Sequence, residues 1–184
     1  MDDNAIIELY FSRSESAISE TATKYGRYCY SIANNILSSK EDSEESVNDT
    51  YLAAWNTMPP QRPSVLATFL GKLTRYISLD RWKARNANKR GGGEVALALD
   101  ELDECISSKE NTEQAFEQKE LLRSVNHFLG MLPETERNIF VCRYWYLDPV
   151  QQIADRHGFS LSKTASMLRR TREKLRTHLA KEGF

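Results

Sequence analysis

Residues 148–181 of the chain read DPVQQIADRHGFSLSKTASMLRRTREKLRTHLAK, and this stretch decides how the C-terminal part of the sequence folds. Asp148 and Pro149 supply an N-cap and a first-turn proline, and a glutamine follows at the capping-box position, which predicts a short helix. Gly158 can end that helix, because glycine adopts the left-handed conformation at little cost. Ser160 can then cap a second, longer helix. The pattern predicts a helix-turn-helix.

The longer helix has an apolar side and a basic side. Helical spacing places on the apolar side Leu161, Thr164, Ala165, Leu168, Leu175 and Leu179. The other side carries Lys163, Ser166, Met167, Arg170 and Lys174. One interpretation is a helix that enters the major groove of duplex DNA, and the alternative is a solvated face at the end of a helical bundle.

The composition is that of a folded protein. The chain has 184 residues, 40% of them hydrophobic and 28% charged, which fits one ordinary domain or two small ones. The sequence opens with two aspartates and contains no apolar run of membrane-spanning length, so we expect a cytoplasmic protein without membrane insertion. Cys29, Cys105 and Cys142 form no CxxC pair, which argues against disulfides and a zinc site.

No catalytic group of residues can be recognised. His127, His157 and His178 are dispersed along the chain. We therefore expect no enzyme activity, no metal and no cofactor.

Charge is strongly segregated along the chain although the net charge is only −1. An acidic block contains Glu41, Asp42, Glu44, Glu45 and Asp49. A basic block follows, with Lys72, Arg75, Arg81, Lys83, Arg85, Lys89 and Arg90. Residues 94–120 are acidic again, and the helix after Ser160 is the second basic block. Two basic surfaces separated by acidic segments indicate two nucleic-acid contacts and at least one other partner.

The N-terminal half predicts helices. Residues 3–38 have helical periodicity with a possible break near residues 12–16. Asp42 or Ser43 can cap the next helix, whose inner face is Val47, Tyr51, Ala54 and Trp55. Residues 56–64 predict a loop stiffened by three prolines. Pro63 can serve as the first residue of a long helix to about residue 88.

This long helix has a face typical of single-stranded nucleic-acid binding. Its apolar stripe is predicted to be Leu66, Phe69, Leu70, Leu73, Ile77 and Ala84. Opposite it lie basic and aromatic residues together: Lys72, Arg75, Tyr76, Trp82, Lys83, Asn86 and Arg90. Cations that bind phosphates and rings that stack on bases are the usual components of such a surface. The alternative is that Tyr76 and Trp82 are half-buried packing residues.

The C-terminal half continues without any strand pattern. Residues 91–111 predict an acidic linker. Asn111 can cap a helix that stops near Leu132, and Pro133 starts another that leads into the helix-turn-helix. The sequence therefore predicts an all-α fold with two small helical domains, residues 1–90 and 112–184.

Three stretches now occur in a recognisable order. The first runs from Asp42 to Tyr51 and is followed by Trp55. The second covers Leu66 to Arg85 and includes Leu79-Asp80-Arg81. The third contains Leu132-Pro133-Glu134, Arg137, Phe140, Arg143, Ile153-Ala154 and Gly158 to Arg176. In this order and spacing the stretches resemble those of the bacterial extracytoplasmic-function (group IV) sigma factors of RNA polymerase.

The resemblance implies a region 2 domain, a linker and a region 4 domain that bind core RNA polymerase and promoter DNA, both duplex and melted. It implies that core polymerase is contacted by Glu45, Asn48 and Asp49. The minus-ten element would be captured and melted by Asn56, Gln61, Arg62, Lys72, Arg75, Tyr76, Trp82, Lys83 and Arg85. The minus-thirty-five element would be read by Ser162, Lys163, Ser166, Met167, Arg169, Arg170 and Lys174. An anti-sigma protein is a further expected partner.

Two other functions fit the same residues. The chain could be a stand-alone helix-turn-helix regulator that dimerises through its N-terminal helices. It could also be an adaptor whose basic faces bind acidic proteins.

Overall fold

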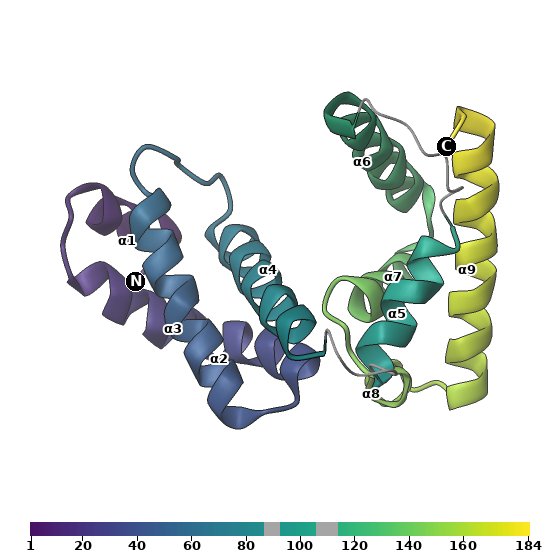
Figure 1. The fold of residues 1–184 in the computed structure, drawn as a ribbon, viewed down its shortest axis with the longest axis horizontal. Helices are drawn as coiled ribbons and strands as arrows, with labels where there is room; N and C mark the ends of the chain where they lie inside the picture. Colours follow the sequence, from purple (N-terminus) through teal and green to yellow (C-terminus); the bar gives the residue numbers. More distant parts are fainter. Residues whose placement is uncertain (87–92, 106–113) are drawn as a thin grey trace. The chain divides into compact units, whose positions relative to one another are not determined.

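We describe residues 1–86, 93–105 and 114–184 of a computed structural model, without the side chains of residues 114–119. In these ranges the regular secondary structure is α-helical and no strand occurs, so the predicted all-α fold is confirmed. The chain divides into two compact units, Met1–Arg90 and Gly91–Phe184 (Figure 1). No helix in the described ranges is long and apolar enough to cross a bilayer.

The first unit is a bundle of four helices. Its helices are α1 (Asp3–Phe11), α2 (Ser16–Leu37), α3 (Lys40–Thr57) and α4 (Leu66–Asn86). Helices α2, α3 and α4 pack against one another, and α1 packs on α2. The buried core includes Ile6, Tyr10, Ile32, Ala33, Ile36, Leu66 and Leu70. The predicted break near residues 12–16 is confirmed, since α1 ends before Ser12 and α2 begins at Ser16.

Two helix starts in this unit differ from the prediction. Ser39, rather than Asp42 or Ser43, caps α3, because its backbone is extended and its hydroxyl accepts a bond from the Asp42 backbone N–H at 3.3 Å. Helix α3 continues to Thr57, so Asn56 is helical and outside the loop. Helix α4 begins at Leu66 and not at Pro63.

Glycine is required where α4 crosses α2. A Cβ atom at Gly71 would lie 2.3 Å from the hydroxyl oxygen of Tyr28. Any larger side chain would have to displace the Tyr28 ring or push the two helices apart. Gly71 therefore fixes how closely α4 approaches the rest of the bundle, and with it the position of the basic face of α4.

The second unit contains α5 (Gly93–Asp103), α6 (Gln114–Met131), α7 (Glu134–Tyr144), α8 (Val150–His157) and α9 (Leu161–Glu182). Helix α9 packs on α6, α7 and α8 (Figure 1). The buried core of the second unit includes Ile139, Phe140, Ile153, Leu168, Leu175 and Leu179.

The prediction of a linker over residues 91–111 is wrong where the structure describes it. Residues 93–103 form α5, which packs against α7. Val95 and Ala98 are buried, and this spacing gives the acidic helix one apolar side. Residues 91–92 and 106–111, with the cap expected at Asn111, lie outside the described residues, as do Lys89 and Arg90.

The helix-turn-helix forms, and two of its three predicted helix ends are confirmed, those at Gly158 and Ser160, whereas the cap at Asp148 is not. Gly158 ends α8 with a φ of 66°, in the left-handed region. Ser160 caps α9 by accepting a bond from the Lys163 backbone N–H at 3.2 Å. Asp148 does not cap α8: Pro149 holds the cap position, and the buried Asp148 carboxylate accepts a bond from Arg156 Nη1 at 2.8 Å.

A polar network around the buried Arg143 joins α5 to α7 and α9. Arg143 of α7 is 1% exposed, and its Nη1 donates to Glu94 Oε2 at 2.6 Å. The Tyr144 hydroxyl donates to Glu101 Oε2 at 2.9 Å and accepts from Arg172 Nη1 at 2.6 Å. The network thus ties the acidic helix α5 to α7 and to the middle of α9.

Substituting Arg143 with alanine should destabilise the second unit by about 3 kcal/mol, because a buried charged side chain loses its bonds and leaves a void. Arg169→Ala is the matched control: Arg169 is 64% exposed on its side chain. The control should change stability by at most about 0.5 kcal/mol. Amide hydrogen exchange in α7 and α9 measures both effects. Unchanged protection in Arg143→Ala would show that the network does not hold the unit together.

Candidate functional site

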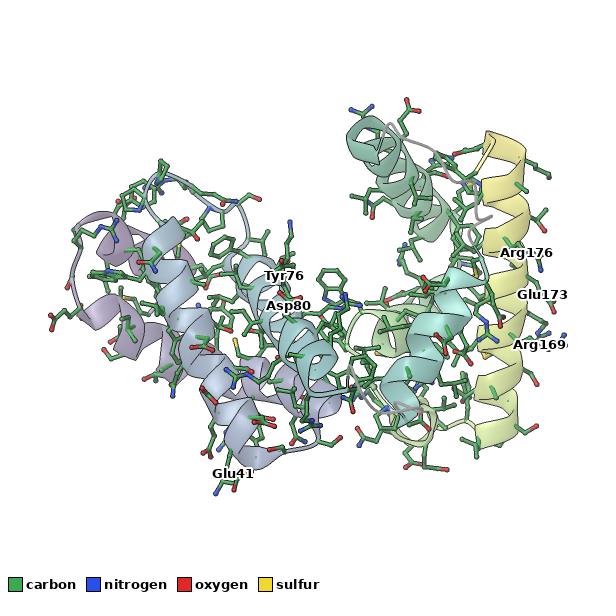
Figure 2. All side chains as sticks on the ribbon, viewed as in Figure 1. Glu41, Tyr76, Asp80, Arg169, Glu173 and Arg176 are labelled. Atoms are coloured by element: carbon green, nitrogen blue, oxygen red, sulfur yellow. The ribbon has the colours of Figure 1, made fainter. Side chains whose placement is uncertain are left out.

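Helix α9 presents a basic outer face. Its exposed residues include Ser162, Lys163, Ser166, Arg169, Arg170 and Lys174, while Met167 is half-buried. Thr164, Leu168, Thr171, Leu175 and Leu179 form the buried side. Leu161 and Ala165 were predicted to be buried and are exposed, because the packed side is turned toward Thr171. Figure 2 shows Arg169 and Arg176 on the outer side of α9.

The cations of this face are held by weak surface contacts. Lys163 Nζ lies 3.6 Å from the ring centre of Phe159, Arg169 pairs with Glu173 at 2.7 Å, and Lys174 pairs with Glu136 at 2.8 Å. Pairs of this kind contribute little to stability and exchange readily with an incoming phosphate. The face is therefore pre-ordered and still available to a duplex.

A basic hollow lies between α7 and α9. It has a volume of about 310 Å³ and is lined by Glu136, Lys163, Met167, Arg170 and Lys174. The Arg170 Nε donates to the Ser166 carbonyl at 3.3 Å, which orients the guanidinium on the face. Three cations beside one carboxylate favour an anionic group such as a backbone phosphate.

Helix α4 has a second candidate face. Lys72, Tyr76 and Lys83 are exposed, and the Tyr76 residue is 67% exposed, which excludes the packing alternative for Tyr76. Trp82 and Arg75 are half-buried, so Trp82 has a packing role as well. Burial lowers the pKa of Arg75. Figure 2 shows Tyr76 and Asp80 on one side of this helix, which places a carboxylate on the basic face.

The buried stripe of α4 is only partly the predicted one. Leu66 and Leu70 are buried as expected. Phe69, Leu73 and Ile77 are half-buried and Ala84 is exposed. The helix turns instead toward the buried Thr74, whose hydroxyl accepts from Thr50 of α3 at 3.1 Å. A small polar contact has replaced the expected apolar one.

Two arginines of the predicted minus-ten set are already bonded within the first unit. Arg62 pairs with Glu8 at 2.5 Å, and its guanidinium lies over the Phe11 ring at 4.6 Å. Arg85 pairs with Asp42 at 2.8 Å and also donates to the Leu37 carbonyl at 2.8 Å. Asn56 and Gln61 are exposed. A nucleic acid that used either arginine would have to displace these contacts.

The three residues expected to contact core polymerase lie on one face of α3. Glu45 and Asn48 are exposed and Asp49 is half-buried. Both carboxylates are bonded to Arg81 of α4, Glu45 at 2.5 Å and Asp49 at 2.8 Å. Sequence reasoning counted Arg81 as part of a basic block and missed this contact, because no local spacing reveals pairing between two helices.

The described residues contain no cluster of His, Cys, Asp and Glu suited to a metal ion. Cys29 and Cys105 are buried and Cys142 is half-buried. Burial raises the pKa of the Cys142 thiol, which disfavours the reactive thiolate.

Replacing Arg170 with alanine should weaken duplex DNA binding and lower the salt dependence of the affinity by about one phosphate contact. Arg123→Ala removes the same charge from the exposed side of α6, outside the helix-turn-helix, and should leave the salt slope unchanged. Fluorescence anisotropy over a series of salt concentrations measures both. An identical slope for wild type and Arg170→Ala would mean that Arg170 touches no phosphate.

Comparison with sequence families gives a match to Sigma-70, region 4, over residues 128–177. The matched residues run from α6 through α7 and α8 into α9. Comparison of the whole chain with curated proteins gives no match. Region 4 of the sigma-70 family is a helix-turn-helix that binds DNA, in agreement with the exposed basic face of α9. Residues 128–177 of the second unit thus match sigma-70 region 4 in sequence and contain the helix-turn-helix of that region.

Proposed function

We propose that the protein is a sigma factor of the extracytoplasmic-function group. It binds core RNA polymerase, directs it to specific promoters and stabilises the melted minus-ten strand. The observation that carries the proposal is the region 4 match over a helix-turn-helix whose second helix exposes Lys163, Arg169 and Arg170. In this role α9 lies in the major groove at the minus-thirty-five element.

The first unit supplies the step that opens the promoter. Tyr76 stands exposed on α4 between the cations Lys72 and Lys83, an arrangement suited to stacking on a base while the cations follow the backbone. Separating two stacked bases costs a few kcal/mol per step, and stacking on an aromatic side chain returns about 1–3 kcal/mol per base. Opening is then favourable only at promoter sequences that unstack easily.

The α3 face supplies the contact with core polymerase. Glu45, Asn48 and Asp49 offer carboxylates and an amide to a basic coiled coil. Delivery by the polymerase also accounts for the net charge of −1, since the free protein need not search DNA by itself. Phosphoryl transfer is carried out by the polymerase and not by this protein. The protein and the polymerase both act in the cytoplasm. An anti-sigma protein would regulate the factor by covering its polymerase-binding and DNA-binding faces.

Gel filtration of the full-length protein with purified core RNA polymerase tests the proposal. A stoichiometric complex that elutes ahead of either component is expected. If the protein elutes apart from core and instead forms a dimer that binds duplex DNA, it is a stand-alone helix-turn-helix regulator.

Reversing a charge on the α3 face should remove core binding. Glu45→Lys or Asp49→Lys is expected to cost at least about 2 kcal/mol in affinity, because it sets like charges against each other at the contact. The fold should survive, since the ion pairs lost to Arg81 are partly exposed.

Glu15→Lys is the control, because it makes the same charge change at an exposed position outside α3. Affinity for core is measured by fluorescence anisotropy, with circular dichroism to verify the fold. Wild-type affinity in both α3 variants would exclude this docking face.

A further inference from the structure

Arg81 bonds the carboxylates of Glu45 and Asp49, which in the proposed function contact core polymerase. Its Nη1 bonds Glu45 Oε2 and its Nη2 bonds Asp49 Oδ2, so a single guanidinium bridges both acids. The arginine side chain is 26% exposed, whereas those of Glu45 and Asp49 are 63% and 46% exposed. The cation therefore sits beneath the carboxylates, and the carboxylates face outward.

The electrostatics favour this bridge. The hydrogen bond to Glu45 raises the pKa of Arg81, and the bond to Asp49 adds to the effect. The two carboxylates therefore stabilise the charged form of the guanidinium. On the next turn of α4, Arg85 forms another ion pair with α3, to Asp42 at 2.8 Å. Three carboxylates of α3 are thus compensated by two arginines of α4 before any partner arrives.

The packing of α3 on α4 does not require these ion pairs. The two helices already bury Val47, Tyr51, Leu66 and Leu70 in the core of the unit. Partly exposed pairs add little to stability. Their main consequence is for binding, because an incoming cation meets carboxylates that already have a partner.

We propose that Arg81 is an internal competitor for the docking face and determines which partners can occupy it. This inference rests on the proposed function for the site, and it names the chemistry of the partner surface. A helical surface that presents two arginines one turn apart can bond both carboxylates and replace the bridge of Arg81. A surface with one arginine only exchanges one bridging guanidinium for another, so it gains no additional ion pair and binds more weakly.

The test compares full-length wild type with Arg81→Met. One probe is core polymerase, and two others are synthetic helical peptides with either two arginines one turn apart or a single arginine. Arg81→Met should bind core and the two-arginine peptide about two- to fivefold more tightly. The preference for the two-arginine over the single-arginine peptide should become smaller.

Two variants serve as controls. Arg81→Lys keeps the charge but loses the two-armed guanidinium, so its affinities should lie between those of wild type and Arg81→Met. Lys24→Met removes a cation that is paired with Asp3 at 2.7 Å between α2 and α1, and should leave both affinities unchanged. Equal gains in Lys24→Met and Arg81→Met would mean that net charge, not competition, sets the affinity, which would overturn the inference.

The outcomes separate this inference from the proposed function. If no variant binds core but Arg81→Met binds the two-arginine peptide more tightly, the sigma function fails and the competition stands. Unchanged or weaker peptide binding by a folded Arg81→Met overturns the competition. If that variant unfolds, displacement of Arg81 is tested in wild type through its Nε–Hε NMR resonance. Saturation with the two-arginine peptide should shift this resonance toward solvent-exposed values. An unmoved resonance refutes displacement.

Discussion

A guanidinium that is 1% exposed must find anionic or carbonyl partners inside the protein, and in the second unit Arg143 finds them on two sides. Glu94 bonds it at 2.6 Å from α5, and the Asp148 carbonyl accepts from it at 3.4 Å at the start of the helix-turn-helix. Its Nε lies 3.8 Å from Glu101, near enough for attraction but too far for a hydrogen bond. Arg143 therefore helps to hold α7 against α5, together with the bond from the Tyr144 hydroxyl to Glu101.

The two units use charge in different ways. In the second unit the buried Arg143 and its carboxylate partners hold helices together, and the exposed cations of α9 can exchange partners. In the first unit the acidic face of α3 is bonded to Arg81 and Arg85 of α4. Any partner of that face must compete with bonds inside the protein. A partner that bonded the α3 carboxylates would therefore release arginines of α4, the helix that also carries Tyr76.

The sequence predicts those features whose cause is local. Gly158 and Ser160 act within one turn of their own backbone, and both form as predicted. The Asp148 signal is equally local, but Pro149 holds the cap position of α8 and the Asp148 carboxylate bonds Arg156 instead. Helix α5 was missed because its acidic residues are compensated by Arg143 and Arg172, far away in the sequence.

The faces of α4 show the same limit. The exposed position of Tyr76 follows from helical periodicity. The half-buried state of Trp82 and the bonds of Arg62 and Arg85 follow from neighbours on other helices, which periodicity cannot reveal. The candidate surfaces are therefore predictable, and the contacts that already occupy them are not.

We propose above that this chain makes core RNA polymerase open promoter DNA. Permanganate footprinting tests it on genomic fragments selected for transcription by core polymerase with this protein. We expect reactive, unpaired thymines near the minus-ten position only when core and protein are both present, and fewer of them with Tyr76→Ala. Specific binding that leaves every thymine paired would contradict it.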